Sequence, residues 1–239
     1  MKVIISQPRY LPAINYLQRL HFADLFVFLD NVQRQDQGVE NRNKILMNGK
    51  ETLLTIPIAS SRLELIKDSL LVNKRWVRKH KEIIRNTYCK HPHYNYEIIN
   101  GYYAGAEEIM DKTGANFADV VIHLVLNLCT IFGFKPNVLR SSHYCSADNL
   151  TGPLKLRKIC EEAGASTYIS GTNGRDYKVK DAFSGSGIEV AFHDYKYPEY
   201  KQYNQEIFVP WLSFFDPLFN LGIEEVKKWI YQKPEFSLE

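Results

Sequence analysis

The sequence predicts an α/β fold, a mostly parallel Rossmann-like sheet with helices on both faces, a β-hairpin excursion and a helical insertion. Three observations support this fold class. Short β-type apolar runs alternate with helical patterns in both flanks of the chain, as in βαβ units. The pair Asn48-Gly49 separates two further β-type runs, and the middle of the chain has a helical pattern. We therefore expect one α/β domain over residues 1–239.

The N-terminal flank contains a strand, a helix and a second strand. Val3–Ser6 is a β-type run that stops at Gln7-Pro8, because proline has no amide to donate. Tyr16–Asp24 has apolar residues at helical spacing, and Leu25–Leu29 is the next β-type run. Since a helical crossover joins parallel strands, we expect these two strands to run parallel.

The middle of the chain departs from this alternation. Polar residues 31–43 have the composition of a loop, and Lys44–Leu46 and Thr52–Ile58 flank the Asn48-Gly49 turn. That dipeptide between apolar runs predicts a hairpin. Residues 73–115 are helical in pattern and rich in aromatic and basic side chains, so we expect a helical lid or inserted subdomain.

The C-terminal flank returns to alternating elements. A helix over Phe117–Phe132 precedes a strand over Asn137–Arg140, and Leu154–Ala163 forms the next helix. Thr167–Ser170 and Ile188–His193 are the last two predicted strands. Strands and helices alternating in this way predict a parallel sheet covered on both faces.

Composition excludes several classes of protein. Hydrophobic residues are 45% and charged residues 24% of the chain, which excludes disordered and fibrous proteins. A formal net charge of +3 gives no reason for a dedicated nucleic-acid surface. The basic and aromatic run at 74–81 could contact RNA, but a solvated helix face is the simpler expectation, so we expect no nucleic-acid partner.

The apolar runs and the cysteine spacing indicate where the protein is located and whether it binds a metal. The N-terminal apolar run is too short for a secretory signal, and the longest apolar stretch, 120–134, is interrupted by His123 and Asn127. We expect a cytoplasmic protein with no membrane span. The four cysteines are far apart and lack paired spacing, which favours reduced thiols and no metal site.

Polar clusters follow the predicted strands, where open parallel sheets bind ligands. We expect them to converge on one cleft, although ordinary turns and caps would use the same residue types. There are four such clusters. The candidate ligand-binding residues of the first three are Gln7, Tyr10, Gln33, Ser141 and Ser142, and Asn41, Arg42 and Asn43, which precede the hairpin, are added to them. Those in the last cluster are Ser170, Gly171, Thr172, Asn173, Gly174, Arg175, Asp176 and Tyr177.

The last cluster is the most informative. Its glycines let the backbone fold close to a ligand, and its hydroxyl, amide and guanidinium groups suit a phosphate or a sugar hydroxyl. Asp30 and His143, both at strand ends, are the candidate acid–base residues, although an aspartate there often caps the next element and a surface histidine is common. Hydrolase, P-loop and dinucleotide motifs are absent from the sequence, so it identifies no cofactor.

The ordered motifs resemble the WbqC-like family over about residues 2–225. They are Gln7-Pro8-x-Tyr10-x-Pro12, Asp30-x-Val32-Gln33, Asn41-Arg42-Asn43, Ser141-Ser142, the segment 168–177 and Leu212-Ser213-x-x-Asp216. One departure is Asn15, where the family usually has glycine before the tyrosine; asparagine tolerates a left-handed backbone, so the turn can survive. The resemblance implies a cytoplasmic bacterial protein of O-antigen or other surface-polysaccharide pathways.

These observations together predict a transferase that acts on an activated or nucleotide-linked sugar, with acyl or aminoacyl transfer to a sugar amine as the favoured reaction. Its partner is then a small molecule, a nucleotide sugar or another phosphorylated metabolite. The alternative is a noncatalytic sugar-nucleotide-binding or scaffold protein that uses the aromatic segment Trp76 to Tyr103 to contact a protein partner.

Overall fold

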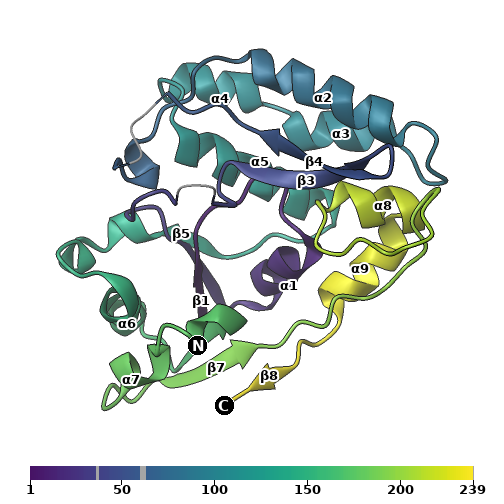
Figure 1. Ribbon diagram of the computed structural model, residues 1–239. Helices are drawn as coiled ribbons and strands as arrows, with labels where there is room; N and C mark the ends of the chain where they lie inside the picture. Colours follow the sequence, from purple (N-terminus) through teal and green to yellow (C-terminus); the bar gives the residue numbers. More distant parts are fainter. Residues whose placement is uncertain (36–37, 60–62, 239) are drawn as a thin grey trace.

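The computed structural model describes residues 1–35, 38–59 and 63–238. The described residues form a central six-stranded sheet with the strand order β5-β2-β1-β6-β7-β8 (Figure 1). Its strands are β1 (Lys2–Ser6), β2 (Leu25–Phe28), β5 (Val138–Arg140), β6 (Thr167–Gly171), β7 (Glu189–His193) and β8 (Phe236–Ser237). The first five of these run parallel, and β8 is antiparallel to β7. The mostly parallel sheet is therefore confirmed.

Both faces of this sheet are covered, because successive side chains of a strand point to opposite sides. Val3 and Ile5 of β1 belong to one hydrophobic core, and Ile4 between them belongs to the other. Helices α6 (Gly152–Glu162) and α7 (Val179–Phe183) cover the first face. The second face is covered by α1 (Ile14–Phe22), α5 (Phe117–Ile131) and α9 (Ile223–Tyr231) (Figure 1).

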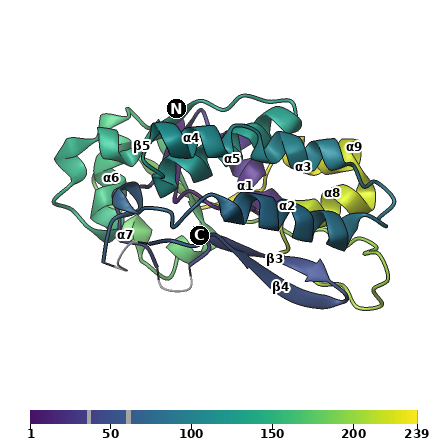
Figure 2. The ribbon, with the colours of Figure 1, turned by 90° about the horizontal axis from the view of Figure 1, so that it is seen from above.

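The predicted turn at Asn48-Gly49 joins β3 (Arg42–Met47) and β4 (Lys50–Thr55), which pair antiparallel as a separate two-stranded sheet. Both turn residues have a positive φ, 50° and 74°, as a two-residue hairpin of this kind requires. The hairpin projects beside α2 (Arg75–Tyr88) and α8 (Phe215–Leu221), as Figure 2 shows from above.

Residues 73–115 are helical, as predicted. They form α2, α3 (Tyr96–Tyr103) and α4 (Ala106–Lys112), and the last two pack against α5. Asn95 caps α3 and Asn116 caps α5, because each side chain accepts a hydrogen bond from an amide of the first helical turn. Trp76 and Tyr103 face the core and are buried.

The order of the strands positions the functional site. The chain moves outward from β1 to β2 and β5, then returns to the other side of β1 to form β6 and β7. The loops after β1 and β6 therefore leave the sheet in opposite directions, which opens a crevice at the carboxyl ends of these two strands. None of the helices described is long and apolar enough to cross a membrane.

Candidate functional site

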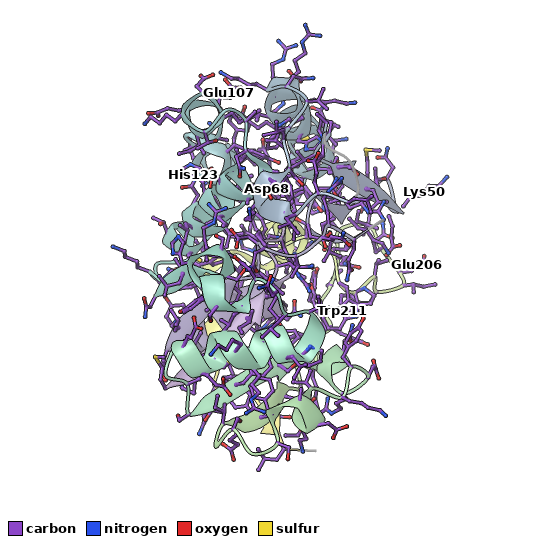
Figure 3. The ribbon with its side chains drawn as sticks, turned by 90° about the vertical axis from the view of Figure 1, so that its left-hand side faces the viewer. Lys50, Asp68, Glu107, His123, Glu206 and Trp211 are labelled. Atoms are coloured by element: carbon purple, nitrogen blue, oxygen red, sulfur yellow. The ribbon has the colours of Figure 1, made fainter. Side chains whose placement is uncertain are left out.

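A cleft of about 580 Å³ lies at the carboxyl ends of β1 and β6, and we call it the β1/β6 cleft. Its apolar lining includes Ile5, Leu156 and Val179. Its polar and charged lining residues are Ser6, Arg9, Asn15, Arg19, Gln35, Lys155, Ser170, Thr172, Asn173 and His193. Trp211 also lines the cleft, and in Figure 3 Glu206 of the same segment lies between Trp211 and Lys50 of the hairpin.

Helix α1 presents Arg19 to this cleft. Asn15 and Arg19 are one helical turn apart and both line the cleft, whereas Leu17 and Leu20 are buried in the core. The Arg19 side chain is only 8% exposed. The guanidinium lies against the end of β6, because a Cβ built on Gly171 would be 3.8 Å from Arg19 Nη1, an ordinary van der Waals distance.

The charges around Arg19 favour an anion. Arg9, in the loop after β1, lines the same cleft, and the Nε atoms of both guanidinium groups are buried without a hydrogen-bond partner among the described residues. None of the described residues that line the cleft is an aspartate or glutamate. Burial, and then the charge of Arg9, lower the pKa of Arg19 to about 10, so the group stays protonated at neutral pH. A bound phosphate would supply the missing counter-charge.

Helix α6 adds to this positive field. Its first residues, Gly152 and Pro153, line the cleft, and the Thr151 side chain makes no cap to the amides of the first turn. The positive end of the helix dipole is therefore next to the cleft. Lys155 donates to the Asn31 carbonyl at 2.8 Å, and burial lowers its pKa. Three cationic side chains and a helix N-terminus thus border one cavity.

His193, at the end of β7, lines the cleft as a neutral imidazole. Burial, and then the charge of Arg19, lower its pKa to about 4. The Gln18 amide donates to the Trp229 carbonyl at 2.9 Å, so its oxygen can only accept, and His193 Nε2 donates to that oxygen at 2.6 Å. The proton therefore resides on Nε2, which leaves Nδ1 as an acceptor that can receive a proton.

The segment after β6 provides the predicted residues that do line the cleft. They are Ser170, Gly171, Thr172, Asn173, Gly174 and Tyr177. Gly174 is required by a close approach, because a Cβ there would lie 2.1 Å from Ser170 Oγ. Arg175 of the same segment is ion-paired with Asp194 at 3.0 Å and lies over the Phe192 ring, and neither it nor Asp176 is among the lining residues.

The clusters after β2 and β5 meet each other and form a closed network. Asp30 is fully buried and accepts hydrogen bonds from Arg140 Nε at 2.6 Å and from the amide and hydroxyl of Ser142, each at 2.9 Å. The Ser141 hydroxyl accepts from the Asp30 amide at 2.9 Å. Arg140 also pairs with Asp119. This network joins the ends of two strands, and its acceptors already have donors.

The remaining predicted residues lie outside the lining of the β1/β6 cleft. Tyr10 is buried between His80 and Tyr103, with its hydroxyl 2.7 Å from His80 Nδ1. Asn41 donates to the Ile56 carbonyl across the base of the hairpin, and Asn43 attaches the hairpin to the loop after β1 by donating to the Leu11 carbonyl. The others are Gln7, whose carbonyl accepts from Tyr16, the half-buried Arg42, and the exposed Gln33 and His143.

The clusters after the four strands therefore converge only in part. The loops after β1 and β6 border the cleft together with Leu29, Val32 and Gln35 of the loop after β2. Asp30 of that loop instead binds the loop after β5. Sequence reasoning missed Arg19, Lys155 and His193 as site residues because each lies on an element that also carries core residues. No motif in the sequence distinguished any of the three from core or surface residues.

Known protein families and relatives were compared with this chain to test the family resemblance. A model of the WbqC-like protein family matches residues 7–228. The chain belongs to this family. It is also 28% identical over 226 residues to the uncharacterized protein Rv1507c of Mycobacterium tuberculosis, an alignment that covers 93% of this chain and 95% of that protein. No solved structure matches the chain.

The departure of this WbqC-like chain from the family pattern has a different explanation from the one predicted. Asn15 lies inside α1, and the positive φ in this loop belongs to Leu11, at 47°. The left-handed tolerance of asparagine is therefore not used. Asn15 instead supplies an amide to the cleft lining, one turn before Arg19.

Proposed function

We propose that the β1/β6 cleft binds the phosphoryl group of an activated or nucleotide-linked sugar, and that the protein transfers a group to that sugar. The observation that carries this proposal is Arg19, a buried guanidinium beside Arg9 with no carboxylate among the described lining residues. A buried cation without a counter-ion is unfavourable unless a ligand neutralises it. Guanidinium groups are well suited to phosphate because they bind it with two parallel hydrogen bonds.

The rest of the cleft fits such a ligand. A volume of about 580 Å³ is in the range of small-molecule sites, about 300–1,000 Å³. Ser170, Thr172 and Asn173 offer hydroxyl and amide groups to a sugar. The strand order, which reverses between β1 and β6, supports a Rossmann-like binding mode at the carboxyl ends of these strands.

The acid–base residue that this proposal uses is His193. Asp30 and His143 do not line the cleft, whereas His193 does and has Nδ1 as a proton acceptor. In acyl or aminoacyl transfer, the sugar amine attacks the carbonyl carbon of an activated acyl donor and an N–C bond forms. The leaving group of the donor departs, and Nδ1 takes the proton from the amine. A bound phosphate would offset the charge of Arg19 and raise the pKa of His193 toward its usual value.

Family membership supports a place in bacterial surface-polysaccharide synthesis, such as that of O-antigen, within the cytoplasm. The alternative is a noncatalytic sugar-nucleotide-binding or scaffold protein, which would use residues 76–103 as an aromatic contact surface. Trp76 and Tyr103 are buried, which removes two of the rings on which that surface depended. Residues 73–115 anchor the loop after β1 through Tyr10, so in this proposal they fix the cleft rather than recruit a partner.

A thermal-shift screen tests the proposal, with sugar phosphates, nucleotide sugars and acyl-CoA compounds as the panel. A ligand at about 100 times its Kd stabilises the folded state by about 2.7 kcal/mol, which raises the Tm of a chain of this size by about 5–10 °C. We expect Arg19→Met to abolish the shift with phosphorylated ligands. Arg175→Met is the matched variant, because Arg175 is an arginine of the same sheet edge that is already ion-paired.

A shift that survives Arg19→Met would contradict the proposed phosphate site. Loss of the shift in Arg175→Met alone would return the site to the segment that the sequence favoured. His193→Gln separates binding from transfer, because the proposal requires it to keep the thermal shift and to lose product formation, measured by mass spectrometry of the acylated sugar.

A further inference from the structure

An exposed indole borders the β1/β6 cleft. Trp211 belongs to the irregular segment between β7 and α8, lines the cleft and is 48% exposed, whereas Trp76 is only 3% exposed. Its ring rests on that of Tyr197, at a centroid distance of 4.9 Å, and is 6.3 Å from that of Tyr195. Tyrosine rings thus support the indole, which keeps part of its surface open to solvent next to the cleft.

The backbone holds Trp211 in an unfavourable conformation. Its φ is 61°, in the left-handed region that bulky residues avoid. Hydrogen bonds fix the chain on either side: the Val209 amide donates to Gln202 at 2.8 Å, and the Ser213 amide donates to the Lys44 carbonyl at 2.9 Å. The segment therefore positions the ring at a conformational cost, which is common at binding sites.

The surroundings of the ring favour a flat aromatic ligand over a sugar. A sugar ring needs a hydrogen-bond partner for each buried hydroxyl. The rings next to Trp211 are those of Tyr195 and Tyr197, whose hydroxyls are buried and therefore cannot reach the hydroxyls of a sugar placed on the exposed part of the indole. Hydroxyl and amide side chains are supplied instead by the end of β6, at Ser170, Thr172 and Asn173.

We propose that Trp211 forms a nucleobase-stacking subsite at the β1/β6 cleft. This inference rests on the proposed function and deepens it, because it makes the activating group of the sugar a nucleotide. The phosphates lie on Arg9 and Arg19, the sugar faces the end of β6, and the base stacks on the open face of the indole. Stacking on an aromatic side chain accepts any base, so the contact adds affinity without selecting one base.

Calorimetric titrations compare the four ribonucleoside monophosphates with ribose 5-phosphate, which has the same sugar and phosphate but no base. We expect the wild-type protein to bind at least one monophosphate tenfold or more tighter than ribose 5-phosphate. Trp211→Asn should remove that difference and leave ribose 5-phosphate binding unchanged. Asparagine is chosen because it tolerates a positive φ.

Fluorescence quenching is a second test, which remains valid if the Trp211→Asn variant does not fold. A stacked base should quench the tryptophan fluorescence of the wild-type protein, ribose 5-phosphate should not, and Trp211→Phe should abolish the quenching and keep the affinity within about threefold. If ribose 5-phosphate binds through Arg19 and no monophosphate binds tighter, the subsite is refuted and the phosphate site stands. If no phosphorylated probe binds in an Arg19-dependent way, the proposed function fails and the subsite fails with it.

Discussion

Replacing Asp30 by asparagine should unfold this protein more easily and leave its ligand affinity unchanged. Asp30 is fully buried and accepts hydrogen bonds from Arg140 and from the amide and hydroxyl of Ser142. Asparagine carries no negative charge at this position, and its N–H group would face the Arg140 and Ser142 groups, which are themselves donors. Removing one partner of a buried ion pair costs about 3–5 kcal/mol.

The expected loss lies at the lower end of that range. Arg140 is 26% exposed and keeps its second partner, Asp119, so its charge is not left alone. We therefore expect Asp30→Asn to lower the free energy of unfolding by about 3 kcal/mol. For a chain of this size, each kcal/mol shifts the Tm by about 2–4 °C, so the Tm should fall by about 6–12 °C.

Urea denaturation and a thermal melt measure the loss of stability, and calorimetry at low temperature measures ligand affinity. Asp119→Asn is the matched control, because it removes the other partner of Arg140 from a site that is 28% exposed; about 1 kcal/mol is expected there. An Asp30→Asn variant that melts within 2 °C of the wild type, or that loses ligand affinity while folded, would refute the structural role. Loss of ligand affinity in the folded variant would make Asp30 a residue of the binding site again.

Three further predictions concern the β1/β6 cleft. Arg19→Met should raise the free energy of unfolding by about 1–2 kcal/mol, measured in urea, because it removes a buried cation that has no carboxylate among the described residues lining the cleft. Gly174→Ala should lower it by about 1–3 kcal/mol, because the added Cβ would lie 2.1 Å from Ser170 Oγ. His193 has a folded-state pKa of about 4, below its ordinary value of 6.5, so its contribution to stability is complete above pH 6.5 and is lost as the pH falls toward 4. The loss of stability between pH 7 and pH 4 should therefore be about 3 kcal/mol smaller in His193→Gln than in the wild type.

Each of these has its own check. An Arg19→Met variant that is less stable than the wild type would mean that the guanidinium has a partner in solution. Adding Ser170→Ala to Gly174→Ala should restore part of the lost stability, because it removes the closest atom; no recovery would contradict the steric explanation. Parallel pH profiles for His193→Gln and the wild type would show that His193 takes up its proton in the folded state as it does in the unfolded chain.

The fold followed from local patterns in most of the chain. β1, β2, β5, β6 and β7 all lie within a residue or two of the predicted strands, because short apolar runs ended by polar or proline residues have few alternatives. The hairpin was predicted for a similarly local reason, the positive φ values that Asn48-Gly49 readily adopts. The C-terminal elements α9 and β8 were not predicted, and β8 is a two-residue strand whose pairing with β7 no local pattern specifies.

The site was harder to predict, because its residues come together only through the order of the strands. Polar residues after four strands gave no indication that β2 would pair with β5 and β1 with β6. From the sequence alone, Asp30 is therefore as suitable for catalysis as any residue at the cleft. Only its contacts with Arg140 and Ser142 distinguish a structural carboxylate from a free one.

By itself the sequence determined the family, the alternation of strands and helices, and the segment 170–174 that borders the cleft. These features are local, since they depend on residue spacing and on which φ angles a residue allows. The tertiary structure alone decided which charges meet. Arg9 and Arg19 face one cavity without a carboxylate among its described lining residues, and Asp30 faces Arg140. Charge pairing depends on distances between segments far apart in the chain, and those distances exist only once the sheet has formed.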